Sequence, residues 1–148
     1  MTKYYLGLIS LIILDRFLKI FFVKTLSLED GVFALYINKN IAFSLPVSPL
    51  ILYPILFLVF FILIFLWYRD FGHEKKYIWP YALIIIGAAS NIWDRLRYGG
   101  VVDYFNVPFF TVFNLSDIYI FLGVCYFLIR QLRNTPSSSP PKLGGGVR

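Results

Sequence analysis

The sequence predicts an all-α membrane protein with four transmembrane helices and a small β-hairpin element on its outer (periplasmic) face. Of its 148 residues, 59% are hydrophobic and only 15% are charged, whereas soluble domains are about 45–50% apolar and about 25% charged. The mean hydropathy is +0.72, and the apolar residues gather in four long runs. A soluble fold of this size has too little interior to hide so much apolar surface, so lipid must solvate much of the chain.

The first apolar run covers about 4–23 and is interrupted by Asp15, Arg16 and Lys19. A cleaved signal peptide is the competing interpretation, but the three charges break the run and no small-x-small cleavage site follows. We therefore expect a retained transmembrane helix. Asp15 and Lys19 are four residues apart, so they share one helix face and are expected to form an ion pair inside the bundle.

A mixed segment at 24–48 follows the first run. Two short β-prone stretches, 32–37 and 41–45, flank the polar residues 38–40, and a turn signal precedes them. This pattern predicts a small hairpin at the membrane surface.

Three further runs predict spanning helices at about 50–68, 77–93 and 110–130. The run at 50–68 is uninterrupted, and at about 1.5 Å per residue it can cross roughly 30 Å of hydrocarbon. The Pro-, Ser- and Gly-rich end, 134–148, is expected to be a disordered basic cytoplasmic tail. Residues 1–133 then form a single membrane-embedded domain.

The basic residues between the spans indicate the orientation. Eight lie on the side of both termini and four on the other. This asymmetry predicts that both termini are cytoplasmic, and it explains the net charge of +6 without a nucleic-acid partner. The eight are Lys3, Arg69, Lys75, Lys76, Arg130, Arg133, Lys142 and Arg148, and the four are Lys24, Lys39, Arg95 and Arg97.

The stretch 87–117 is where chemistry is expected. Three of the eight acidic residues lie in it, and two asparagines each stand three residues before an aspartate. Ionisable groups in membrane-embedded sequence are costly and usually functional. These five polar residues are Asn91, Asp94, Asp103, Asn114 and Asp117.

The depth of the acidic residues suggests one shared site. Helix rise places Asp15 and Asp117 roughly 18–20 Å from the cytoplasmic face and Asp94 roughly 27 Å from it. Acidic groups from three helices should therefore meet between helices in the outer half of the bilayer. We expect a polar site that opens to the outer aqueous side.

Five short motifs resemble those of the prolipoprotein signal peptidases (signal peptidase II). They are DRFLK at 15–19, NKNIAFS at 38–44, GAASNIWDR at 87–95, VVDYF at 101–105 and FNLSD at 113–117. The resemblance implies an aspartyl endopeptidase of a bacterial cytoplasmic (inner) membrane, which cleaves lipid-modified preproteins before their diacylglyceryl-cysteine and needs no cofactor or metal. The implied partners are this substrate and membrane lipids. The oligomeric state stays open, and a monomer is compatible with the sequence.

The resemblance also implies roles for individual residues. The catalytic pair corresponds to Asp103 and Asp117. Two positions depart from the family pattern, because Asn40 and Ser90 stand where glycine is usual. The residues expected to support the site or bind substrate are Asp15, Lys19, Asn38, Asn91, Asp94, Arg95 and Asn114.

The residue chemistry is consistent with this assignment. Two adjacent carboxyls cannot both ionise cheaply, so they share a proton, and one can activate water while the other polarises the carbonyl. Asn114 and Asp117 also fit a helix N-cap with its capping-box partner, and a helix N-terminus favours an ionised Asp117. We therefore expect Asp117 to be the ionised member and Asp103 the proton carrier. A serine mechanism would need Lys19 to reach Ser90 or Ser116 as base.

Two other functions remain open at this level. A proton- or ion-coupled membrane carrier would use buried acids as a relay, and a non-enzymatic assembly module would use them only for packing. The cytoplasmic halves of all four predicted spans contain no acidic residue. A relay would need acids at several depths, so this distribution favours a one-sided site.

The predicted orientation can be tested with reporter fusions. A reporter that is active only in the cytoplasm should be active when fused after Arg133 and inactive when inserted near Asp30, because the basic residues hold both termini inside. The opposite activity pattern would overturn the orientation and the outward-facing site.

Overall fold

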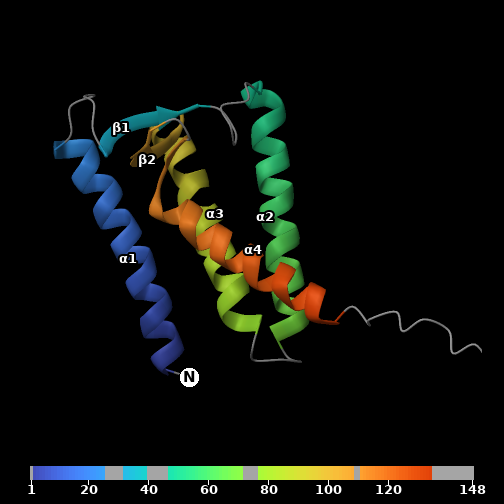
Figure 1. The fold of residues 1–148 in the computed structure, drawn as a ribbon. Coiled ribbons are helices and arrows are strands. Elements are labelled where there is room, and N and C mark those ends of the chain that lie inside the picture. The colour runs from blue at the N-terminus through green and yellow to red at the C-terminus, as the bar shows by residue number, and fades with distance from the viewer. Residues whose placement is uncertain (1, 26–31, 40–46, 72–76, 109–110, 135–148) are drawn as a thin grey trace, which may run out of the picture.

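The computed structural model describes residues 2–25, 32–39, 47–71, 77–108 and 111–134. In Figure 1 a small sheet lies at one end of the helices, and the start of α1 and the end of α4 lie toward the opposite end. The described elements are α1 (Thr2–Thr25), β1 (Phe33–Asn38), α2 (Pro49–Phe71), α3 (Ile78–Tyr98), β2 (Val101–Val107), β3 (Thr111–Phe113) and α4 (Leu115–Asn134).

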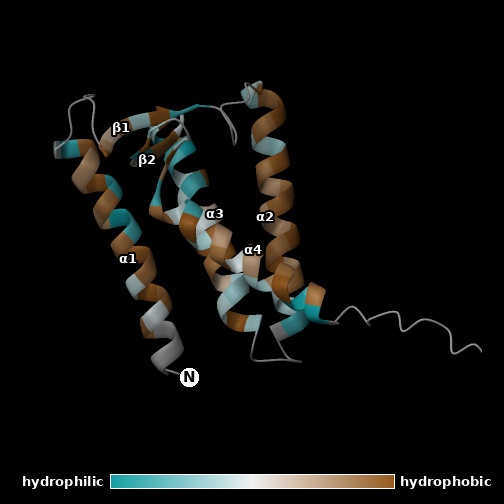
Figure 2. Ribbon diagram, viewed as in Figure 1, coloured by the Kyte–Doolittle hydropathy of each residue, from teal (hydrophilic) through white to brown (hydrophobic). Residues whose placement is uncertain are grey.

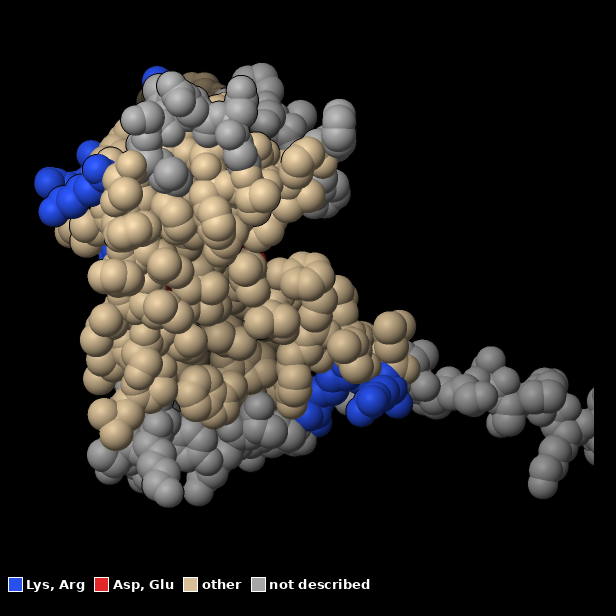
Figure 3. All heavy atoms as spheres, turned by 60° about the vertical axis from the view of Figure 1, so that its left-hand side comes forward, with Lys and Arg blue, Asp and Glu red and all other residues tan. Residues whose placement is uncertain are grey.

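The outer surface of the helices is largely apolar. The segments Pro49–Asp70 and Leu115–Arg133 are long and apolar enough to cross a membrane, by length and composition. Figure 2 shows α2 as hydrophobic along most of its length, and large side chains such as Leu50 (86% exposed) face outward. On the face shown in Figure 3, Lys and Arg lie toward the two ends and almost no acidic atom is visible. Because α1 and α3 carry internal charges, their role as spans stays a prediction.

The three strands form one antiparallel sheet in the order β1-β2-β3. Tyr36 of β1 lies opposite Asp103 of β2, and Phe105 of β2 lies opposite Phe113 of β3. The sheet therefore carries Asp103 on its central strand, and β3 leads directly into α4.

The structure corrects two of the sequence predictions. Most of the stretch 32–37 lies in strand β1 (Phe33–Asn38), which pairs with β2, and the other half of the predicted hairpin, 41–45, lies outside the described residues. The all-α class is therefore incomplete, because a three-stranded sheet accompanies the helices. The last helix begins at Leu115 rather than near 110, because 111–113 is a strand. Strand pairing depends on which segments the tertiary fold brings together, and a local pattern of β-prone residues does not report that.

A tight turn joins α3 to β2. Gly99 has a φ of 72°, in the left-handed region that glycine adopts at little cost, and its N–H donates to the Arg95 carbonyl at 3.0 Å. A side chain on the next residue, Gly100, would come within 2.9 Å of the Asn38 carbonyl oxygen. The two glycines thus let β2 turn back beside α3 and against the end of β1.

A small apolar core holds the sheet against α1. Phe22, Val102 and Tyr104 are buried together, and the Phe22 and Tyr104 rings stack with their centroids 4.4 Å apart. The Tyr104 hydroxyl also accepts a hydrogen bond from the Leu115 backbone N–H at 3.1 Å. This core fixes β2 between the C-terminal end of α1 and the start of α4.

Candidate active site

One asparagine contacts both aspartates of the expected pair. The side-chain amide of Asn114 donates to Asp103 Oδ1 at 2.6 Å, and the Asn114 backbone N–H donates to Asp117 Oδ2 at 3.1 Å. Asp103 comes from β2 and Asp117 from the first turn of α4. Asn114 and Asp103 are almost fully buried. The fold therefore brings the two carboxyls together around a single residue.

The same asparagine begins the helix. Asn114 Oδ1 accepts the Asp117 backbone N–H at 3.0 Å, and the Asp117 carboxylate accepts the Asn114 N–H in return. This reciprocal pair is a capping box, so the predicted N-cap is confirmed. The Asp117 carboxylate also lies in the first turn of α4, at the positive end of the helix dipole, which stabilises negative charge.

Two further asparagines complete the hydrogen bonding of the carboxyls. Asn38 Nδ2 donates to Asp103 Oδ2 at 3.1 Å, and Asn91 Nδ2 donates to Asp117 Oδ1 at 2.8 Å. Each carboxyl group therefore accepts hydrogen bonds on both of its oxygens. Because the three side-chain amides are neutral, they orient the carboxyls without adding a charge to the site.

The environment of Asp103 favours its protonated form. Burial, together with the negative charge of Asp117, raises the pKa of Asp103 to about 7, even though the hydrogen bonds from Asn38 and Asn114 oppose the shift. A carboxyl with this pKa can hold or release its proton near neutral pH. This supports the expectation that Asp103 is the proton carrier.

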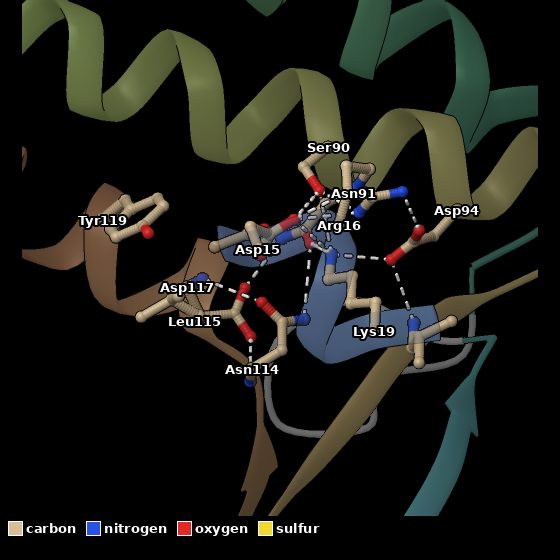
Figure 4. Close-up of polar contacts among 12 residues, drawn as sticks. Asp15, Arg16, Lys19, Ser90, Asn91, Asp94, Asn114, Leu115, Asp117 and Tyr119 are labelled. Carbon is tan, nitrogen blue, oxygen red and sulfur yellow. Dashed lines mark hydrogen bonds and ion pairs between the residues drawn. The ribbon is translucent and has the colours of Figure 1, made fainter. Parts of the chain in front are cut away.

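A buried cluster of four charges lies beside Asp117 (Figure 4). Asp94 accepts from Lys19 at 2.6 Å, from Arg16 at 2.9 Å and from the Val102 backbone N–H at 3.3 Å. Asp15 pairs with Arg16 at 2.9 Å and with Lys19 at 3.8 Å, which confirms the predicted pair on α1. The two carboxylates and the two cationic side chains have equal and opposite charge, so the cluster adds no net charge to its apolar surroundings.

Lys19 links this charged cluster to the aspartates. Its ammonium group donates to Asn91 Oδ1 at 2.9 Å, and the same amide donates to Asp117. Asn114 Nδ2 also lies 3.3 Å from Asn91 Oδ1. The positive charge therefore acts on Asp117 through a polarised amide.

Arg95 of α3 lies beside the two carboxyls. Its Nη1 donates to the Asn91 backbone carbonyl at 3.4 Å, and its charge interacts with both Asp103 and Asp117. The Tyr53 hydroxyl of α2 donates to the Arg95 carbonyl at 3.3 Å. Arg95 is thus placed to supply positive potential to both carboxyls.

Sequence reasoning gave no site role to three residues that the structure places in the network. Arg16 appeared only as a charge that interrupts an apolar run. Ser90 appeared as a replacement for a glycine usual in the family, and both Ser90 and Ser116 as nucleophiles that would need Lys19 as base. In the structure Arg16 and Ser90 are hydrogen-bonded to each other, and Ser116 Oγ donates to Asp15 at 2.5 Å. A charged residue next to Asp15 in a spanning segment was the available signal, because such a charge needs a buried partner.

The structure also answers the question of a serine mechanism. Lys19 Nζ does lie 3.1 Å from Ser90 Oγ. However, Lys19 is held as a cation by Asp94, and Ser90 already donates its proton to Asp15 Oδ2 at 2.5 Å. A lysine in an ion pair is a poor base, so the arrangement does not activate Ser90. Within the described ranges, no three His, Cys, Asp or Glu side chains are grouped as metal ligands.

Comparisons with known proteins agree with the geometry. A family model described as signal peptidase (SPase) II matches residues 8–133. The lipoprotein signal peptidase of Sulfurovum sp. (strain NBC37-1) is 35% identical over 122 residues, which cover 72% of this chain and 80% of that protein. The lipoprotein signal peptidase of Wigglesworthia glossinidia brevipalpis is 34% identical over 136 residues, covering 82% and 89%.

The fold is also similar to a solved structure. A protein described as a bacterial membrane enzyme superposes with a TM-score of 0.75, covering 100% of this chain and 96% of its own, at 20% identity. This likeness shows a shared fold. All the candidate site residues lie within the matched region 8–133.

The charged cluster predicts a large stability effect at Asp94. Replacing Asp94 with Asn should destabilise the protein by about 3–5 kcal/mol, because it leaves Lys19 and Arg16 with excess buried positive charge. Unfolding in detergent micelles measures this. Asp70→Asn is the matched control, because Asp70 pairs with the exposed Arg69, and such a pair contributes only about 0–1 kcal/mol. Asp70 also accepts from the Tyr81 hydroxyl at 2.8 Å, and the asparagine oxygen can still accept that bond. Equal losses in the two variants would contradict the role of the cluster.

Proposed function

The chain belongs to the signal peptidase II family, and from this premise we propose that it is an aspartyl endopeptidase that removes signal peptides from lipid-modified prolipoproteins. Family membership supports cleavage of lipoprotein signal peptides. The observation that carries the aspartyl mechanism is that Asn114 bridges the carboxyls of Asp103 and Asp117 in a buried site. We further propose that the scissile bond lies just before the diacylglyceryl-cysteine.

The reaction starts with one proton shared between the two carboxyls. Ionised Asp117 takes a proton from water as the water oxygen attacks the peptide carbonyl carbon. Protonated Asp103 gives its proton to the carbonyl oxygen, so the tetrahedral intermediate carries no full negative charge. Asp117 then protonates the leaving nitrogen, the C–N bond breaks, and Asp103 recovers its proton from the intermediate hydroxyl. Each carboxyl gains and loses one proton over the cycle, so the pair of Asp103 and Asp117 (the dyad) returns to its starting state.

The surroundings of the two carboxyls support this division of roles. Asp117 stands at a helix N-terminus and accepts from the Asn91 amide, whose oxygen receives Lys19. Asp103 lies on a buried strand where burial raises its pKa to about 7. A site with one carboxyl favoured as the base and the other as the acid needs little rearrangement before reaction.

The proposal includes the membrane setting. We propose four spanning helices with both termini in the cytoplasm of a bacterial cell and the site toward the outer face of the inner membrane. The apolar exterior of α2 and α4 and the placement of the sheet at one end of the helices support it. The family match favours cleavage over a proton- or ion-coupled carrier.

Peptidase activity is tested directly with a defined substrate. Purified protein in detergent should release the signal peptide from a diacylated lipoprotein precursor, measured by gel shift or mass spectrometry. Asp103→Asn and Asp117→Asn should each lower turnover roughly 10²–10⁴-fold, because an amide has nearly the same shape but cannot carry the proton. The double variant should be little worse than either single one, because the pair acts as a unit.

The controls separate loss of chemistry from loss of folding. Both variants should keep the elution volume and unfolding temperature of the unmodified protein within a few degrees. Asp70→Asn, far from the site on α2, should keep full activity. Near-normal turnover in either dyad variant would rule out the aspartyl assignment.

The pKa of Asp103 predicts the alkaline side of the pH–rate profile. Turnover should fall as pH rises through about 7, because Asp103 then loses the proton that the carbonyl oxygen needs. Asn38→Ala removes a hydrogen bond that lowers the pKa of Asp103, so this limb should move to higher pH. Thr111→Ala on β3 is the control and should leave the limb unchanged. A downward shift in Asn38→Ala would contradict the assigned role of Asp103.

A further inference from the structure

The Asp15 carboxylate joins two helices other than its own. Asp15 Oδ1 accepts from Ser116 Oγ of α4, and Asp15 Oδ2 accepts from Ser90 Oγ of α3, both at 2.5 Å. Distances of this size are typical of hydroxyl groups that donate to a carboxylate. Asp15 and Ser116 are fully buried, so no solvent competes for these bonds.

Each serine stands immediately before a residue that supports or forms the dyad. Ser90 precedes Asn91 on α3, and Ser116 precedes Asp117 on α4. Asn91 and Asp117 are themselves joined by the 2.8 Å hydrogen bond between the two helices. The α1 carboxylate therefore spans the α3–α4 interface directly beside the bond that orients the base.

The interface is closely packed at the same level. A Cβ atom on Gly87 of α3 would collide with the Ser116 backbone carbonyl oxygen and come within 2.8 Å of Ile120 Cγ1. Packing thus sets a minimum separation of the helices. The serine bonds to Asp15 supply the attraction that holds the helices at that separation.

We propose that Asp15, Ser90 and Ser116 form a clamp that positions Asp117 for catalysis, a role that rests on the proposed peptidase function. The clamp holds α3 and α4 at the separation where Asn91 reaches Asp117. Arg16 and Lys19 neutralise the Asp15 charge and also donate to Ser90, so they keep its hydroxyl turned toward Asp15. The three clamp residues are positioning residues, because they act through Asn91 and Asp117.

Hydroxyl removal tests the clamp in the full-length protein in detergent, with the diacylated precursor as substrate. Ser90→Ala and Ser116→Ala should each lower kcat roughly ten-fold with little change in KM, because small misplacements of a catalytic group are costly. The double variant should resemble the worse single variant, because both bonds share one carboxylate. Ser90→Thr, which keeps the hydroxyl, should restore kcat. Ser10→Ala, an exposed serine on α1, should have no effect.

A distance measurement provides a readout that does not depend on activity. In a Cys125→Ser background, spin labels at Ala89→Cys and Leu122→Cys report the α3–α4 separation, and both positions are exposed. The distance distribution should be narrow in the parent and in Ser10→Ala, and broader in Ser90→Ala and Ser116→Ala.

The outcomes separate this proposal from the proposed function. Unchanged distributions in the serine variants, or broader ones with unchanged kcat, would overturn the clamp. Complete loss of turnover in Ser90→Ala, reproduced in the unmodified protein by a serine-acylating reagent, would overturn it too by making Ser90 a nucleophile. If the unmodified protein leaves the precursor intact while the distributions broaden, the peptidase function fails and the helix clamp stands.

Discussion

The charge-balanced cluster of Asp15, Arg16, Lys19 and Asp94 connects four elements that build the site, α1, α3, α4 and β2. Its residues come from α1 and α3, and it reaches α4 through Ser116 and β2 through the Val102 backbone N–H. Buried charges are strongly unfavourable unless each is paired and hydrogen-bonded. In apolar surroundings no water can replace a missing partner. The cluster is therefore favourable only when all four elements are in place, which makes assembly of the site and folding of the protein a single requirement.

The dyad is held by amides rather than by cations. Asn38, Asn91 and Asn114 together supply side-chain donors to both carboxyls, and Lys19 donates its hydrogen bond to Asn91, which in turn donates to Asp117. A lysine or arginine bound directly to a carboxylate would favour the ionised form throughout. A neutral amide can donate to the ionised form, and its weaker interaction lets the carboxyl take up a proton. This suits the proposed mechanism, in which the pair exchanges one proton during each reaction cycle.

The orientation of Asp103 follows from its position on β2, because successive side chains of a strand point to opposite faces of the sheet. Val102 and Tyr104 are the buried neighbours of Asp103, and they pack against Phe22 of α1. Because successive side chains of a strand point to opposite faces, Asp103 faces away from this apolar core and toward Asn114. The aromatic core and the acid site thus depend on the same strand register. A slip of one residue would bury Asp103 against Phe22 and remove it from its partners.

The sequence by itself determined the four helical segments, the acidic and amide residues of the site, and the N-cap at Asn114. These features depend on hydropathy, on motif spacing and on hydrogen bonds between residues three apart, all of which are local. Only the tertiary structure decided that β1 pairs with β2 and that α4 begins after a strand. It also decided that Arg16, Ser90 and Ser116 join Asp15. Strand partners and buried hydroxyl contacts depend on which surfaces of distant segments meet, and no local periodicity in the chain encodes that choice.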